Sequence, residues 1–117
     1  MRIFISAAPS LLAALAATAA WAHAFLDHAE PRVGSTTATA PRELVLHYTQ
    51  NLEPAFSSVE VSDANGARVD LGKPTISAST MRVGLKPLPP GTYRVRWHVL
   101  SVDTHTTQGS FTFHVKQ

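Results

Sequence analysis

The sequence contains no cysteine among its 117 residues. This absence excludes a blue-copper site, a zinc site built on thiolates, and any thiol nucleophile. It also excludes disulfide bonds, which most small exported domains use to offset a limited hydrophobic core. The stability of the fold must therefore come from packing, with or without a bound ion.

Charge is also sparse. The chain has ten Lys and Arg residues and eight Asp and Glu residues, and charged residues make up 15% of it. The basic residues are scattered along the sequence and form no stripe or cluster. This distribution excludes nucleic acid as the partner.

Long apolar runs are absent except at the start of the chain. Arg2 supplies a positive charge, residues 3–20 are apolar and uncharged, and residues 20–22 (Ala-Trp-Ala) place small residues where a signal peptidase cleaves. The run is about long enough to span a bilayer, but Pro9 and the cleavage pattern favour removal. We therefore expect residues 1–22 to be a cleaved signal peptide, and the exported chain, 23–117, to contain no membrane span.

After the predicted cleavage site, apolar and polar residues alternate with the period of half-buried strands. Tyr93, Val95, Trp97 and Val99 alternate with Arg94, Arg96 and His98, and the same pattern recurs at 43–48, 59–62, 81–86 and 111–116. Turn signals such as Asp63-Ala64-Asn65-Gly66 separate the runs. The pattern predicts one all-β domain of about seven short antiparallel strands, packed as a Greek-key sandwich.

Three residues form a candidate metal site. Cleavage after Ala22 makes His23 the first residue, so that its α-amine and its ring Nδ1 can chelate one ion. Asp103 and His105 are two apart, and in extended backbone such residues point the same way. An Asp-X-His pair alone more often caps a turn, but with His23 it completes three nitrogens and one oxygen, a set that suits Cu(II). The sequence thus predicts one Cu(II) per chain, bound by His23, Asp103 and His105.

The other histidines have simpler interpretations. His98 and His114 fall on outward strand faces and are expected to be solvated. His47 is expected to be a face residue held by hydrogen bonds. Asp27 and His28 lie close to the predicted mature start, and whether either one contributes to the copper site is left open.

Five parts of the chain match a known pattern: 23–26 (His-Ala-Phe-Leu), 30–31 with Gly34, 90–97, 101–105 and 109–115. Through these segments the chain resembles the CopC family of periplasmic copper-resistance proteins. The resemblance implies an immunoglobulin-like or cupredoxin-like barrel, a periplasmic location, and a Cu(II) site at His23, Asp103 and His105. It also implies a role in copper sequestration, homeostasis or resistance, with delivery to a CopD-like inner-membrane protein as a further expectation. Met81 is the only methionine after the signal, so the chain resembles members without a Met-rich Cu(I) site.

Two other function classes fit parts of this pattern. Lytic polysaccharide monooxygenases also hold copper with an N-terminal histidine, but this domain has little room for a substrate-binding plane and shows no row of exposed aromatics. A metal-free immunoglobulin-like interaction module is the second alternative. The sequence favours a monomeric copper-binding protein that is not an enzyme.

Overall fold

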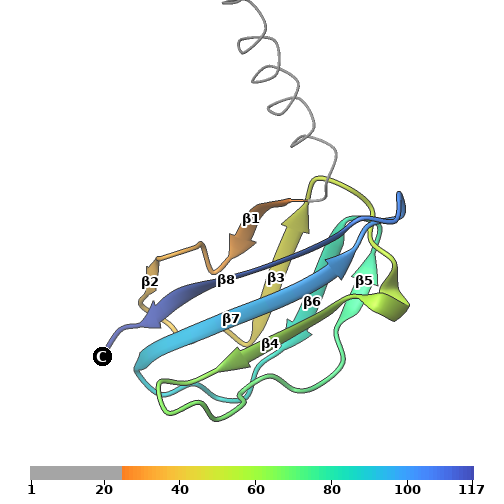
Figure 1. Ribbon diagram of the computed structural model, residues 1–117. Helices are drawn as coiled ribbons and strands as arrows, with labels where there is room; N and C mark the ends of the chain where they lie inside the picture. The colour runs from red at the N-terminus through yellow and green to blue at the C-terminus, as the bar shows by residue number, and fades with distance from the viewer. Residues whose placement is uncertain (1–24) are drawn as a thin grey trace, which may run out of the picture.

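The computed structural model describes residues 25–117 (Figure 1). The predicted signal peptide and His23 lie outside these residues. Two four-stranded sheets make up the fold, in the orders β1-β3-β6-β5 and β2-β8-β7-β4. The first sheet contains β1 (Leu26–Glu30), β3 (Glu43–Tyr48), β5 (Thr75–Ser77) and β6 (Thr80–Gly84). The second contains β2 (Thr36–Thr37), β4 (Ser58–Ser62), β7 (Gly91–Leu100) and β8 (Thr106–Val115).

The two sheets pack face to face, and the first four strands alternate between them (Figure 1). The all-β prediction is confirmed. The expectation of purely antiparallel pairing was wrong at one place, because Thr36 and Thr37 of β2 pair in parallel with His114 and Val115 of β8. The reason is that β2 is reached by crossing from the other sheet, and only neighbours joined by a tight turn must be antiparallel. One short 3-10 helix, Pro54–Phe56, follows β3.

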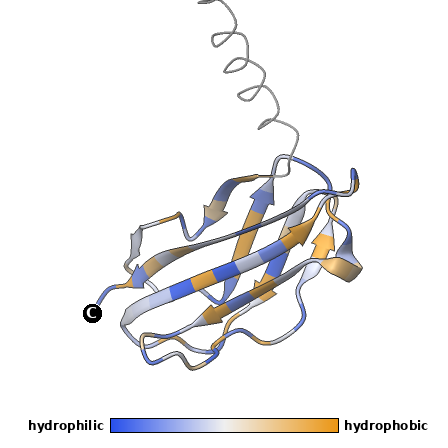
Figure 2. Ribbon diagram, viewed as in Figure 1, coloured by the Kyte–Doolittle hydropathy of each residue, from blue (hydrophilic) through white to orange (hydrophobic). Residues whose placement is uncertain are grey.

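The core lies between the sheets and follows the alternation of the sequence. Figure 2 shows β7 alternating between hydrophobic and hydrophilic residues along its length. Tyr93, Val95 and Val99 of β7 are buried, as are Phe111 and Phe113 of β8. The remaining core residues include Leu44, Leu46, Tyr48, Val59, Val61, Met81, Val83 and Val115.

Val45 departs from the pattern, because it belongs to the polar face of β3 and yet is only 7% exposed. Its register partners are Glu30 on β1 and Arg82 on β6. The long side chains on both sides cover it, since apolar stems of polar residues pack against neighbouring apolar surface.

The hairpin of β7 and β8 positions the candidate site. Ten residue pairs join these strands, from Gly91 with Val115 to Leu100 with Thr106. Residues 101–105 therefore form the connection at one end of the sandwich. The alternating pattern placed the last strand at 111–116, but β8 begins at Thr106, because its cross-strand pairing with β7 continues past Gly109. No helix in the described part of the chain is long and apolar enough to cross a membrane.

Candidate metal centre

The loop that carries Asp103 and His105 is a tight turn. The Ser101 N–H donates to the carbonyl of His105 at 2.9 Å, and the Thr104 N–H donates to the carbonyl of Ser101 at 2.9 Å. Thr104 adopts φ 73°, a left-handed conformation that is an outlier for a β-branched residue. The backbone between the two candidate ligands is therefore curled and not extended.

The turn brings the two candidate ligands together. Nδ1 of His105 lies 3.4 Å from Oδ1 of Asp103, and both side chains are partly exposed, at 46% and 39%. Two donors bound to one ion at about 2.0–2.2 Å lie no more than about 4 Å apart, so this gap permits both to share an ion. The predicted convergence is found, but its cause is different: a turn with Thr104 at positive φ achieves it, and not the two-residue repeat of a strand.

Ser101 is a further residue of the site, and the sequence prediction did not include it. It is completely buried, and its hydroxyl donates a short hydrogen bond to Oδ1 of Asp103. That hydrogen bond is the main reason why the pKa of Asp103 lies below its usual value, and the neighbouring His105 lowers the pKa further. The carboxylate is thus ionised and oriented before any ion arrives. The only sequence signal was a small hydroxyl residue two positions before the aspartate.

The described chain begins at the same end of the sandwich. The N–H of Phe25 donates to Oγ1 of Thr49 at 2.9 Å, and the Thr49 N–H donates back to the carbonyl of Phe25 at 2.9 Å. Two residues further on, the carbonyl of Asn51 accepts the Val102 N–H at 3.0 Å. The segment 49–51 thus connects the start of the first strand to the turn that holds Asp103.

Within residues 25–117, no three His, Asp or Glu side chains are positioned to hold one ion. Two of the three predicted ligand residues, Asp103 and His105, lie side by side in the structure. The third, His23, lies outside the described residues. The donors present are a carboxylate oxygen and an imidazole nitrogen, which fit Cu(II) chemistry. Met81 is completely buried in the core, so its thioether faces apolar neighbours.

Of the two histidines expected to be solvated, only His98 is exposed. His114 is half-buried, because it lies on a central strand of its sheet, and its Nδ1 lies 2.9 Å from the hydroxyl of Thr92. His47 is a face residue, with Nε2 placed 3.3 Å from Oε1 of Glu30. His28 stacks on His47 in the first sheet, while the turn of Asp103 and His105 belongs to the second.

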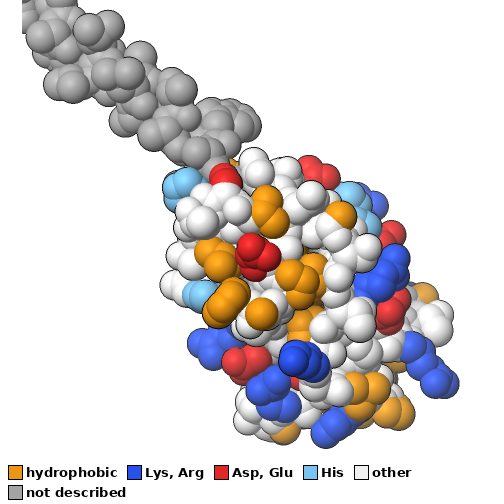
Figure 3. All heavy atoms as spheres, turned by 90° about the vertical axis from the view of Figure 1, so that its right-hand side faces the viewer, with side chains coloured by type: hydrophobic (Ala, Val, Ile, Leu, Met, Phe, Trp, Pro, Cys, Tyr) orange, Lys and Arg blue, Asp and Glu red, His pale blue; other side chains and the backbone are white. Residues whose placement is uncertain are grey.

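Exposed apolar side chains accompany the turn. Phe56 is 66% exposed and Val102 is 51% exposed. Figure 3 views this end of the molecule and shows hydrophobic side chains gathered across the middle of the face, with Lys and Arg mainly toward its lower and right-hand margins.

Comparison with known proteins identifies the family. The CopC domain matches residues 26–116. Protein YobA of Escherichia coli K12 is 32% identical over 110 residues, which cover 91% of this chain and 89% of the relative. Copper resistance protein C of Xanthomonas campestris pv. juglandis is 34% identical over 113 residues, which cover 89% of this chain and 88% of that protein.

A solved structure shares the fold. The crystal structure of PcoC, a methionine-rich copper resistance protein from Escherichia coli, superposes with a TM-score of 0.72 at 32% identity and covers 81% of this chain and all of that one. The match of the CopC domain to nearly all described residues, together with these relatives, shows that the chain belongs to the CopC family of copper resistance proteins.

Proposed function

We propose that the protein is a periplasmic Cu(II)-binding protein whose mature chain begins at His23. One Cu(II) ion is bound by the α-amine and ring of His23, the carboxylate of Asp103 and the ring of His105. The observation that carries the proposal is the 3.4 Å approach of the His105 ring to the Asp103 carboxylate at the end of the sandwich where the described chain begins.

The position of the chain start supports the amine as a ligand. His23 precedes Phe25 by two residues, and two residues of chain span at most about 7 Å. Segment 49–51 is hydrogen-bonded to Phe25 on one side and to Val102, next to Asp103, on the other. The described chain thus begins next to the segment that is hydrogen-bonded to the turn, which supports a site that includes the first residue of the mature chain.

The donor set favours Cu(II) over Cu(I). Three nitrogens and one oxygen suit Cu(II), whereas Cu(I) prefers thiolates and thioethers. The chain has no cysteine, and Met81 is buried in the core. In contrast to the methionine-rich PcoC, this protein is expected to release copper to a Cu(I) chelator when ascorbate reduces the bound ion.

The role that follows is sequestration of Cu(II) in copper homeostasis or resistance, by a monomer without catalytic activity. Transfer to a CopD-like inner-membrane protein fits the partly exposed position of both ligands, because an acceptor can reach the ion from solvent. The exposed Phe56 and Val102 beside the turn supply apolar surface for such a contact.

The test compares Cu(II) affinity among variants of the exported protein, by competition with a chelator of known strength. Mass spectrometry must first show that the chain starts at His23. One extra residue before His23 is expected to lower the affinity by several orders of magnitude, since it removes the free amine from the chelate ring. Asp103→Ala and His105→Ala are expected to weaken binding, with the larger loss at His105.

His98→Ala is the matched control, because it removes an exposed histidine from the same sheet and should leave affinity unchanged. Electron paramagnetic resonance should report nitrogen couplings from the bound ion, with one nitrogen fewer in His105→Ala. An extended protein that bound Cu(II) as tightly as the mature form would disprove the proposed site.

A further inference from the structure

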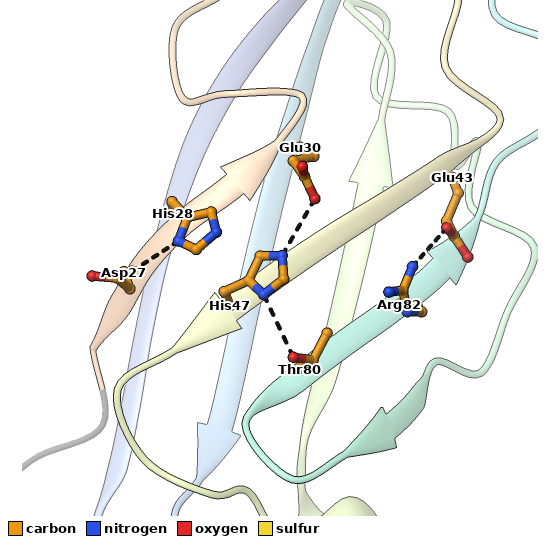
Figure 4. Close-up of polar contacts among 7 residues, drawn as sticks. All are labelled: Asp27, His28, Glu30, Glu43, His47, Thr80 and Arg82. Atoms are coloured by element: carbon orange, nitrogen blue, oxygen red, sulfur yellow. Dashed lines mark hydrogen bonds and ion pairs between the residues drawn. The ribbon is translucent and has the colours of Figure 1, made fainter.

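A second group of metal-ligating side chains lies on the first sheet, on the face opposite the core (Figure 4). His28 on β1 and His47 on β3 are register partners in the antiparallel pair. Directly opposite residues of such a pair project to the same side, with Cβ atoms about 4.5–5.5 Å apart. Glu30 follows His28 by two residues on β1 and therefore shares this side. The backbone register thus places two imidazoles and a carboxylate together, whichever rotamers they adopt.

A bulge adds a second carboxylate. The pairing of β1 with β3 shifts register between Leu26 and His28, so Asp27 is exposed together with His28. Oδ2 of Asp27 lies 2.8 Å from Nδ1 of His28. That contact leaves Nε2 of His28 as the ligand atom. A carboxylate on one ring nitrogen with a metal on the other is the usual arrangement of metal-binding histidines.

His47 is held much more loosely. Its Nε2 lies 3.3 Å from Oε1 of Glu30, and its Nδ1 lies 3.5 Å from Oγ1 of Thr80. Both distances are at or beyond the long end of the range for hydrogen bonds. Turning the His47 ring toward an ion therefore breaks only weak hydrogen bonds. Glu30 lies close enough to His47 for its carboxylate to bind the same ion.

The rings stack in the metal-free arrangement, with centroids 4.1 Å apart and planes at 11°. A shared ion must lie near the plane of each ring, so the rings have to turn out of the stack before both nitrogens can bind it. This agrees with the finding that no three such side chains in residues 25–117 already surround one point. The movement is open to the side chains of His28 and Glu30, because they are 56% and 67% exposed, and exposed side chains change rotamer in picoseconds to nanoseconds. The side chain of His47 is 28% exposed, and its polar contacts to Glu30 and Thr80 are both long.

We propose that His28, His47 and Glu30 form a second Cu(II) site on the outer face of the β1–β3 pair, with Asp27 orienting the His28 ring. Two imidazoles and a carboxylate form a nitrogen and oxygen set, for which Cu(II) has the highest affinity among the divalent first-row metals. The site uses only side chains of described residues and needs no free amino terminus. It binds more weakly than a site with a chelating amine, because the ligands must first leave their stack.

The experiment isolates this site by using protein that carries both His23→Ala and His105→Ala, which removes the two imidazoles of the site at the β7–β8 turn. Cu(II) ions are titrated in while NMR follows the ring signals of all histidines and calorimetry measures the affinity. The paramagnetic ion should broaden the His28 and His47 signals first. His28→Ala and Glu30→Gln should each weaken this binding, by at least tenfold for His28→Ala, while His98→Ala should leave it unchanged.

Because His28 lies on an exposed edge strand, its variant keeps the core intact, and a thermal melt of the metal-free form verifies this. The proposal is overturned if His28→Ala and His98→Ala bind Cu(II) equally in this background, or if the His23→Ala, His105→Ala protein takes up no Cu(II) at millimolar concentrations of the ion. Neither result bears on the site at Asp103 and His105, since that site is tested separately with the mature amino terminus.

Discussion

Replacing Gly109 with alanine tests how tightly the β7–β8 hairpin is packed next to the turn that carries Asp103 and His105. Gly109 pairs with Trp97 across the hairpin. A Cβ at position 109 would lie 2.6 Å from Cζ2 and 2.9 Å from Cε2 of Trp97. Carbon atoms pack best at about 3.5–4.0 Å, so the indole would have to move. Tyr48 limits this movement of the indole, because its ring packs edge to face against the Trp97 ring, with centroids 5.4 Å apart.

The expected magnitude follows from two opposing terms. Forcing an extra methyl group into a packed region costs about 1–3 kcal/mol. Alanine in place of glycine in a strand recovers about 0.5–1 kcal/mol, because the unfolded chain has less freedom to lose. The net loss of unfolding free energy is therefore at most about 2.5 kcal/mol, with a central value of about 1 kcal/mol. For a domain of this size each kcal/mol lowers Tm by about 4–8 °C.

Urea unfolding followed by tryptophan fluorescence and thermal unfolding followed by circular dichroism measure this loss. Trp97 is the fluorescent reporter, since the other tryptophan, Trp21, lies in the predicted signal peptide. The matched control repeats Gly109→Ala in a Trp97→Leu background, which is followed by circular dichroism alone because it lacks the reporter; there the clash is absent and the change should be neutral or stabilising. A Gly109→Ala protein as stable as the wild type, or an equal loss in both backgrounds, would refute the reasoning.

Three further substitutions probe buried polar groups. Asp70→Asn should lower the unfolding free energy by about 1–3 kcal/mol. Although burial opposes the charge, hydrogen bonds from Arg68 and a backbone N–H hold the pKa of Asp70 below its ordinary value. The stabilisation is thus present at neutral pH. The difference in unfolding free energy between the wild type and Asp70→Asn, measured by urea unfolding, should become smaller as the pH falls through that low pKa. Tyr48→Phe should stabilise the fold by about 1 kcal/mol in thermal melts, because the buried Tyr48 hydroxyl has no hydrogen-bond partner within the described chain; a loss of stability would contradict this. Ser101→Ala should raise the pKa of Asp103 toward its usual value in a carboxyl NMR titration and weaken Cu(II) binding about tenfold; Ser101→Ala in an Asp103→Ala background should then have no further effect on affinity.

Much of the fold could be predicted because its main signal is local. The alternation of Tyr93, Val95 and Val99 with polar neighbours assigned β7 and its buried face, and all three are buried. Met81 was likewise assigned to the inward face of its strand, and it is completely buried. Side chains of a strand alternate with period two wherever the strand lies, so no tertiary information is needed for this step.

The candidate metal centre could be predicted from the sequence only in part. The spacing of Asp103 and His105, together with the resemblance to CopC, indicated that they act together, and the two side chains do converge. The turn with Thr104 at positive φ and the buried Ser101 hydroxyl behind Asp103 could not be predicted. Residue spacing does not reveal which backbone conformation brings two side chains together.

The sequence by itself determined the chemical limits of the protein: no thiolate, one methionine after the predicted signal, and a histidine that cleavage would make the first residue. Only the tertiary structure decided which distant residues meet. His28 and His47 are 19 positions apart, and nothing local marks them as a pair until the register of β1 with β3 places them opposite each other. Register depends on how whole strands bury their apolar faces and on where a bulge inserts, so it is a property of the assembled sheets.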